Sequence, residues 1–198
     1  MGIWLDAAVV KWPLSSPRAS RVSVEQVAQV RVDHAADQHR VGVGSGDAAA
    51  QLGLSPRQVL PSSTGVIGWS LPEEAMIAAL PAAVGALAPG SVLPAAEGIV
   101  TTDLYPKVRR ADVGGGSIVG IAKGAGMIGP NMATTICVIT TDAAISKPLL
   151  AKALKEAIGQ SLNRLTVDGH QSTNDTAMIL ASGAAENSPI TSQCPRYK

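Results

Sequence analysis

The chain has 198 residues, a formal net charge of +1 and a hydrophobic content of 46%, which is enough to bury a core. Sixteen Lys and Arg residues balance fifteen Asp and Glu residues, with no dense basic run of the kind that nucleic-acid or anionic-membrane binding requires. The two cysteines, Cys137 and Cys194, form neither a metal-spaced pair nor a disulfide framework. We therefore expect a cytoplasmic chain with no nucleic-acid partner, no membrane partner and no metal.

The N-terminal part of the chain, residues 1–45, shows no sustained helical or strand period. We therefore expect a poorly determined segment there, with disorder as one alternative, followed by a domain over 46–198. The opening residues carry an acid at Asp6 and only a short apolar stretch, which does not resemble a secretory signal. The run 75–96 lacks charge but contains several prolines and glycines. This pattern predicts a helix, a break and a loop rather than a membrane span.

Helix and strand signals alternate through the rest of the chain. A helix is predicted to begin at Pro72-Glu73-Glu74 and to end or bend at Pro81. A second helix is predicted after Ser146, with one apolar stripe that packs on a sheet. Strands are predicted at 117–122, 134–140 and 164–168, and residues 176–182 fit either a strand or a helical turn. Such alternation predicts an α/β fold.

The segment from Ile118 to Asp142, IVGIAKGAGMIGPNMATTICVITTD, joins two apolar runs through a glycine-rich loop that ends at an Ala-Thr pair. A threonine hydroxyl held against the preceding carbonyl can attack it and break the bond between Ala133 and Thr134. The freed Thr134 then carries a nucleophile beside its own α-amine, whose ordinary pKa of about 7.7–8.0 suits a general base. On chemistry alone Thr135 competes with Thr134, and an ordinary strand-loop-strand is the alternative to both.

Five segments occur in the order and approximate spacing of a known enzyme family. Together they resemble the bifunctional ornithine acetyltransferases, also called glutamate N-acetyltransferases. The segments are SSTGVIG (62–68), TTDLYPK (101–107), GIAKGAGMIGPNMAT (120–134), TTDA (140–143) and TVDGHQSTNDT (166–176).

The resemblance implies that the precursor cuts itself between Ala133 and Thr134. The new N-terminal Thr134 would take an acetyl group from N-acetylornithine and pass it to glutamate. Thr64 and Gly65 would form the oxyanion hole that stabilises the transition state. No cofactor is implied, because the acetyl group is carried on the threonine itself.

Thr101 and Lys123 would contact the amino-acid substrate, and a lysine cation can hold a substrate carboxylate. The family fold implied is a partial αββα-type sandwich, in which the two cleavage fragments associate with each other or with another copy. Whether acetyl-CoA is also an acetyl donor stays open at this stage.

The chain departs from the family pattern in length, because family members are about twice as long, and the resemblance covers about 48–188. A catalytically inactive fragment is therefore one alternative to the acetyltransferase. An amidohydrolase or peptidase is another, because water can replace the amino acceptor. Asn174 and Asp175 are either catalytic residues or residues that build a turn.

Overall fold

The structure, a computed structural model, describes residues 26–31, 45–66, 69–113, 115–130, 135–172 and 175–192. Its strands are β1 (Gln26–Arg31), β2 (Lys107–Val113), β3 (Gly116–Lys123), β4 (Ile136–Thr141) and β5 (Thr176–Ala181). Its α-helices are α1 (Ser45–Leu52), α2 (Glu73–Gly85), α3 (Leu93–Gly98) and α4 (Lys147–Gln160), and its 3-10 turns are η2 (Pro56–Gln58) and η3 (Leu162–Arg164).

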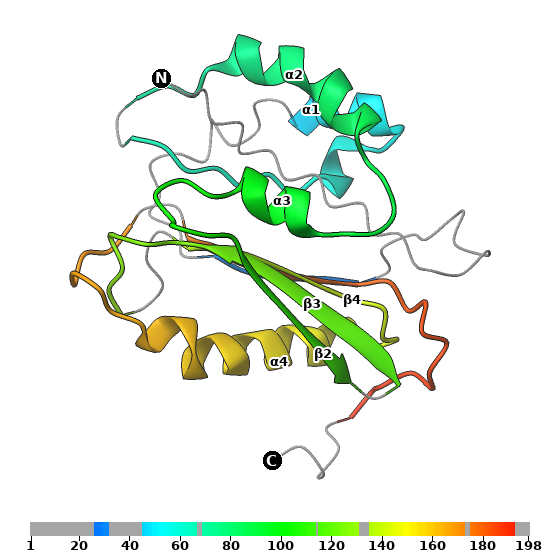
Figure 1. Cartoon of the computed structure of the whole chain (residues 1–198). Coiled ribbons are helices and arrows are strands. Elements are labelled where there is room, and N and C mark those ends of the chain that lie inside the picture. Colours follow the sequence, from blue (N-terminus) through cyan, green and yellow to red (C-terminus); the bar gives the residue numbers. More distant parts are fainter. Residues whose placement is uncertain are drawn as a thin grey trace.

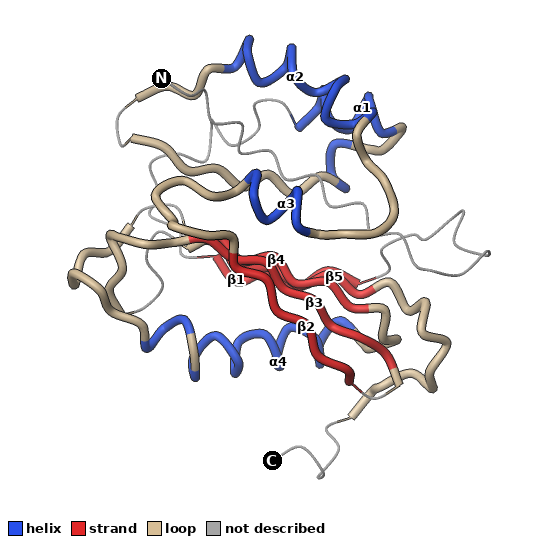
Figure 2. Tube along the Cα trace, viewed as in Figure 1, coloured by secondary structure: helices blue, strands red, loops and turns tan. Residues whose placement is uncertain are grey.

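The strands form one mixed sheet in the order β1-β5-β4-β3-β2. The β4–β5 pair is parallel and is connected through α4, whereas the other three pairs are antiparallel. Figure 2 shows the five strands as a single layer between the helices. Because β1, from the first part of the chain, pairs with β5, near its end, the sheet depends on contacts between residues distant in sequence.

The two faces of the sheet bury different helices. In Figure 1, α4 lies against one face and α3 against the other, with α1 and α2 beyond α3. The α4 face is packed by Leu150, Leu154 and Ile158 against residues of β4 and β5. The α3 face is packed by Ala96 and Ile99 against residues of β3, β4 and β5. Helices on both faces of a mixed sheet confirm the predicted α/β class.

Several predicted elements are confirmed and one is wrong. β3, β4 and α4 occupy the predicted ranges within two residues, α4 packs on the sheet, and 176–181 is a strand. Residues 164–168 form no strand, because the backbone N–H groups of Val167 and Asp168 donate to the carbonyl of Ile128 in a loop. This segment therefore hydrogen-bonds to the loop that contains Ile128 rather than extending the sheet.

Other differences concern the first half of the chain. Pro81 lies inside α2 and does not end it. Helix α3 begins within the run 75–96, where a loop was predicted to end that run. Strands β1 and β2 were not predicted. β1 lies within 1–45, where no periodic pattern marks it, and the boundary at 45/46 stays a prediction. Of the described helices, none has both the length and the apolar character needed to span a bilayer.

Candidate functional site

The glycine-rich loop, residues 124–135, connects β3 to β4. The structure describes residues 124–130 and Thr135 of this loop, and the predicted cleavage residues Ala133 and Thr134 lie outside the described residues. The site is therefore defined by the side chains that hydrogen-bond to the described part of the loop backbone. Three aspartates from two of the sequence motifs, TTDLYPK and TVDGHQSTNDT, accept hydrogen bonds from its backbone.

Asp103 holds the start of the loop. Its Oδ1 accepts the backbone N–H of Gly124 at 2.9 Å and also a hydrogen bond from Lys107 Nζ. Lys107 Nζ in turn donates to the Gly124 carbonyl at 3.2 Å. Gly124 has a φ of 144°, a conformation that side chains with Cβ rarely adopt, so glycine is required here.

The electrostatics of Asp103 favour its charged form. Burial would raise the pKa of this carboxyl, but the hydrogen bond and charge of Lys107 and the backbone N–H groups of Gly124 and Thr101 lower the pKa below its usual value. Asp103 is therefore an ionised anchor at neutral pH. Through this hydrogen bond Asp103 links the TTDLYPK motif, which begins at Thr101, to Gly124, the residue directly after Lys123.

Asp168 holds the middle of the loop. Its carboxylate accepts the backbone N–H groups of Met127 at 2.7 Å and Ile128 at 3.0 Å, and also that of His170 at 3.1 Å. The N–H groups of His170, Met127 and Ile128 lower the pKa of Asp168, and the His170 charge adds to this effect. Met127 has a φ of 54°, which is uncommon for a residue other than glycine.

The same motif touches the loop backbone directly. The Ile128 carbonyl accepts the N–H groups of three consecutive residues, Val167, Asp168 and Gly169, at 2.8–3.3 Å. A Cβ added at Gly129 would lie 3.0 Å from the carbonyl carbon and oxygen of Gly169. The loop and the TVDGH segment are therefore in backbone-to-backbone contact, which leaves no room for a side chain at residue 129.

Asp175 holds the end of the loop. Its Oδ1 accepts the backbone N–H of Thr135 at 2.5 Å, and the Thr176 N–H donates to the Thr135 carbonyl at 2.9 Å. Asp175 is 0% exposed, although an ionisable side chain is costly to bury. From the sequence, Asp175 was either a catalytic residue or a residue that builds a turn. In the structure its side chain is hydrogen-bonded to Thr135, the residue that follows Thr134.

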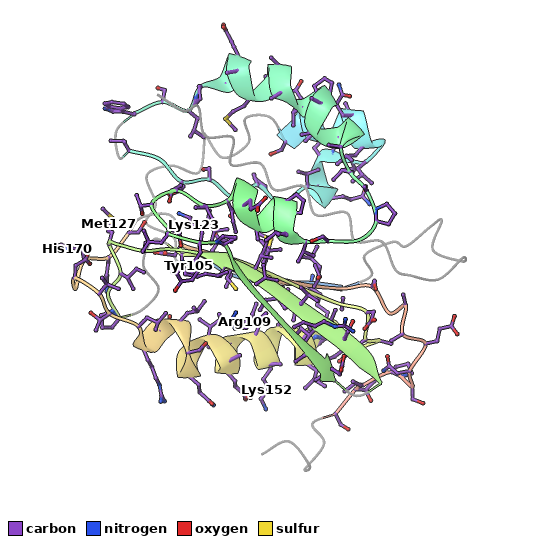
Figure 3. All side chains as sticks on the ribbon, in the orientation of Figure 1. Tyr105, Arg109, Lys123, Met127, Lys152 and His170 are labelled. Carbon is purple, nitrogen blue, oxygen red and sulfur yellow. The ribbon has the colours of Figure 1, made fainter. Side chains whose placement is uncertain are left out.

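Buried polar side chains gather at this end of the sheet. Lys123, at the end of β3, is 2% exposed and lies opposite Ile136 of β4, which in turn lies opposite Thr176 of β5. Thr135, Ser172 and Asp175 are buried beside these positions in the chain. Figure 3 shows Lys123, Met127 and His170 at this end of the molecule. Such clustering of buried polar and ionisable groups is typical of functional sites.

The remaining predicted site residues lie on two other segments. Thr101 is half-buried in the turn between α3 and β2. Thr64 is half-buried and Gly65 exposed in the extended segment between η2 and α2. Leu60 of that segment packs against the apolar cluster on the α3 face. In Figure 1 the segment passes between α2 and α3 towards the end of the molecule that holds the glycine-rich loop.

The family model for ArgJ matches residues 39–196, which is most of the chain. The chain belongs to the ArgJ family. Among curated relatives, the protein named arginine biosynthesis bifunctional protein ArgJ from Symbiobacterium thermophilum is 44% identical over 155 residues. Proteins of the same name from Psychrobacter arcticus and Thermus thermophilus are 47% and 46% identical over 155 and 143 residues.

These alignments cover 76%, 76% and 72% of this chain but only 39%, 38% and 37% of the respective relatives. The chain thus spans less than two-fifths of the length of these ArgJ relatives. The matched part contains all five motifs from which the resemblance was inferred.

Sequence reasoning missed Asp103 and Asp168 as site residues. Each follows a short polar or β-branched stretch and precedes a turn, Asp103 in TTDLYPK and Asp168 in TVDGH. An aspartate before a turn is an ordinary signal for a residue that accepts backbone N–H groups. The sequence does not reveal that the accepted groups belong to a loop 21 to 41 residues away. Among the described residues, no group of three or more His, Cys, Asp or Glu is arranged to hold a metal ion.

Proposed function

We propose that this ArgJ-family chain carries the nucleophile of an acetyltransferase of arginine biosynthesis. It cuts itself between Ala133 and Thr134 and moves an acetyl group from N-acetylornithine to glutamate through Thr134. One observation carries the proposal: three aspartates of two family-like segments converge on the glycine-rich loop that contains Thr134. An enzyme that attacks its own backbone needs that backbone held in place, since correct orientation of the reacting groups lowers the barrier.

The cleavage step balances without a co-reactant other than water. The Thr134 hydroxyl oxygen bonds to the carbonyl carbon of Ala133, the peptide C–N bond breaks, and the hydroxyl proton passes to the departing nitrogen. The nitrogen becomes the α-amine of Thr134. Water then hydrolyses the ester, which leaves a carboxylate on Ala133 and restores the threonine hydroxyl.

The transfer step uses the same hydroxyl, with the α-amine of Thr134 as general base. Thr64 and Gly65 stabilise the oxyanion, and one such donor contributes about 2.7–4 kcal/mol. Thr101 and Lys123 position the amino-acid substrate, and Lys123, at the buried end of β3, in its charged form suits a substrate carboxylate. The acetyl group forms an ester with Thr134 between donor and acceptor, so no cofactor takes part. A biosynthetic role of this kind places the protein in the cytoplasm.

The sheet topology implies that the two products of cleavage stay together. β1, β2 and β3 would belong to the first fragment, whereas β4, α4 and β5 would belong to the second. Because β4 pairs with β3 and β5 pairs with β1, the second fragment is hydrogen-bonded on both sides to the first. We expect the two fragments to elute as one species unless they are denatured.

Intact mass under denaturing conditions tests the self-cleavage. The parent is expected to yield two fragments that meet between Ala133 and Thr134, and Thr134→Ala is expected to stay whole. Thr135→Ala is the matched control, because it alters the neighbouring threonine and leaves the proposed nucleophile in place. Cleavage of Thr134→Ala, or cleavage at the other threonine, would contradict the proposal.

The acetyl-transfer step needs a separate measurement. The cut protein is mixed with N-acetylornithine or acetyl-CoA, and the fragment that begins at Thr134 is weighed for one added acetyl group. Glutamate should then remove the group and appear as N-acetylglutamate. Loss of the group to water at the same rate with and without glutamate would indicate an amidohydrolase instead.

A second candidate function is favoured by one observation. β2 forms an end of the sheet, and its residues 109–113 are exposed. An open edge strand is a site for pairing with another chain, which fits an inactive chain that associates with a partner. This candidate predicts that the parent stays uncut and melts without a sharp cooperative transition. A cooperative melt of the isolated chain would speak against it.

A further inference from the structure

Asp175 is a fully buried carboxylate that the proposed reaction does not yet use. It lies directly before β5, is 0% exposed, and accepts the Thr135 N–H at 2.5 Å. The nitrogen of that N–H is covalently bonded to the carbonyl carbon of Thr134. The hydrogen bond therefore acts on the peptide group on the C-terminal side of the proposed nucleophile.

The backbone of Thr135 is held on both sides. Thr176 N–H donates to the Thr135 carbonyl at 2.9 Å, while the Asp175 side chain accepts from the Thr135 nitrogen. β4 and β5 are parallel with Ile136 opposite Thr176, so Thr135 extends the ladder by one residue beyond β4. Both backbone polar groups of Thr135 are thus hydrogen-bonded, one to the Asp175 side chain and one to the Thr176 backbone.

A second aspartate makes the same bond at the other end of the sheet. Asp142 Oδ1 accepts the Ser117 N–H at 2.5 Å, just after the last residue of β4. Asp142 therefore joins β4 to β3 as Asp175 joins β5 to the start of β4. The two bonds match in donor, acceptor and length, but only the Asp175 bond acts on the residue next to Thr134.

We infer that Asp175 is a positioning residue for self-cleavage, an inference that rests on the proposed function. The orientation of the peptide group after Thr134 relative to its Cα defines one of the two backbone dihedrals of that residue. The same Cα carries both the hydroxyl side chain and the nitrogen of the bond to Ala133, so holding this peptide group limits movement of the atom to which both reacting groups are attached. A misplacement of about 1 Å in such a geometry can cost about 100-fold in rate.

The rate of self-cleavage tests the inference, measured by intact mass well below the melting temperature of every variant. Asp175→Ala should be cut about 10- to 100-fold more slowly than the parent. Asp142→Ala should be cut at the parental rate, although it loses an equivalent bond. Asp175→Asn should regain most of the rate, because an amide oxygen can accept the same N–H.

Amide exchange of Thr135 provides a readout that does not depend on cleavage. In the Thr134→Ala background, which cannot be cut, the Thr135 N–H should exchange slowly. Adding Asp175→Ala should speed that exchange at least about tenfold, because the acceptor is lost. Adding Asp142→Ala should leave the Thr135 exchange unchanged.

The outcomes separate the two proposals. A parent that stays whole overturns the proposed function, and with it the role of Asp175 in that function. A parent that is cut while Asp175→Ala is cut equally fast overturns the positioning role alone. Equal slowing by Asp142→Ala and Asp175→Ala would also overturn it, because the effect would then be general to the sheet.

Discussion

Lys107 donates a hydrogen bond to Asp103, four residues earlier, and the two side chains together hold both polar groups of the Gly124 backbone. The side chain of Asp103 is 0% exposed and that of Lys107 is 39% exposed. The pair therefore joins the turn before β2 to the first residue of the glycine-rich loop. The contribution of this pair to the free energy of unfolding can be measured apart from any catalytic activity.

Asp103→Ala is expected to lower the free energy of unfolding by about 1.5–3 kcal/mol, because a charged acceptor and its backbone hydrogen bond are lost. Urea unfolding at pH 7 gives the value. Asp112→Ala is the matched control, since Asp112 pairs with Arg110 at 3.4 Å but is 85% exposed. Such a surface pair contributes about 0–1 kcal/mol. An equal loss of unfolding free energy in the two variants would show that Asp103 contributes no more than an exposed ion pair.

The contribution of Asp103 should depend on pH. The pKa of this carboxyl in the folded protein is lowered by Lys107 and backbone N–H groups despite its burial, which by itself would raise it. The unfolded-state pKa of an aspartate is about 3.9, so the stabilisation is complete well above that value and is lost as the pH falls through the lower folded-state pKa. The difference in unfolding free energy between the parent and Asp103→Asn should shrink below about pH 4. A difference that stays constant down to pH 2.5 would contradict this expectation.

Gly129→Ala should destabilise the loop. The new Cβ would meet backbone atoms of Gly169 and His170 at 3.0–3.1 Å, and backbone cannot move aside as a flexible side chain can. We expect a loss of about 1–3 kcal/mol, as for other overpacked sites. Thermal unfolding measures it, and slower self-cleavage should accompany it.

Gly159→Ala is the matched control for that substitution. Gly159 lies in α4, and a Cβ there meets nothing within 4 Å. Replacing glycine by alanine at a compatible helical position stabilises by about 0.4–1 kcal/mol. The two identical substitutions should thus shift the melting temperature in opposite directions. Stabilisation by both would mean that the contact between residues 129 and 169 is looser than the structure shows.

Leu154→Ala should remove packing between α4 and the sheet. Leu154 is 2% exposed within the cluster that joins α4 to β4 and β5. A buried Leu→Ala change costs about 2–5 kcal/mol, the amount depending on how far the cavity collapses. Leu165→Ala provides the comparison, because Leu165 is 48% exposed and its loss should change stability little. Urea unfolding of the two variants distinguishes them.

Cys137 should be unreactive in the folded protein. Burial raises the pKa of its thiol to about 11, so only about one molecule in a thousand carries the thiolate at pH 8. In a Cys194→Ser variant, a thiol reagent at pH 8 should label the chain only after urea is added. Rapid labelling without urea would show that the α4 face of the sheet opens readily.

The sequence by itself determined the family resemblance and several local elements. Glycine and β-branched residues mark β3 and β4, and a single apolar stripe marks α4, because these signals are periodic and local. β1 and β2 carry no comparable pattern: β2 is exposed over most of its length, so its residues need not alternate. Pro81 was expected to end or bend α2, and the helix continues past it.

Only the tertiary structure decided how the site is held together. Asp103, Asp168 and Asp175 reach loop backbone that is 21 to 41 residues away, and bonds between a side chain and a distant backbone leave no periodic trace. The segment 164–168 suggested a strand, yet the N–H groups of Val167 and Asp168 bond to the Ile128 carbonyl instead. Thr134 and Ala133 were chosen from sequence chemistry and resemblance, and their roles stay predictions. The sequence predicts the reacting residues, whereas the fold determines which side chains hold the described part of the glycine-rich loop.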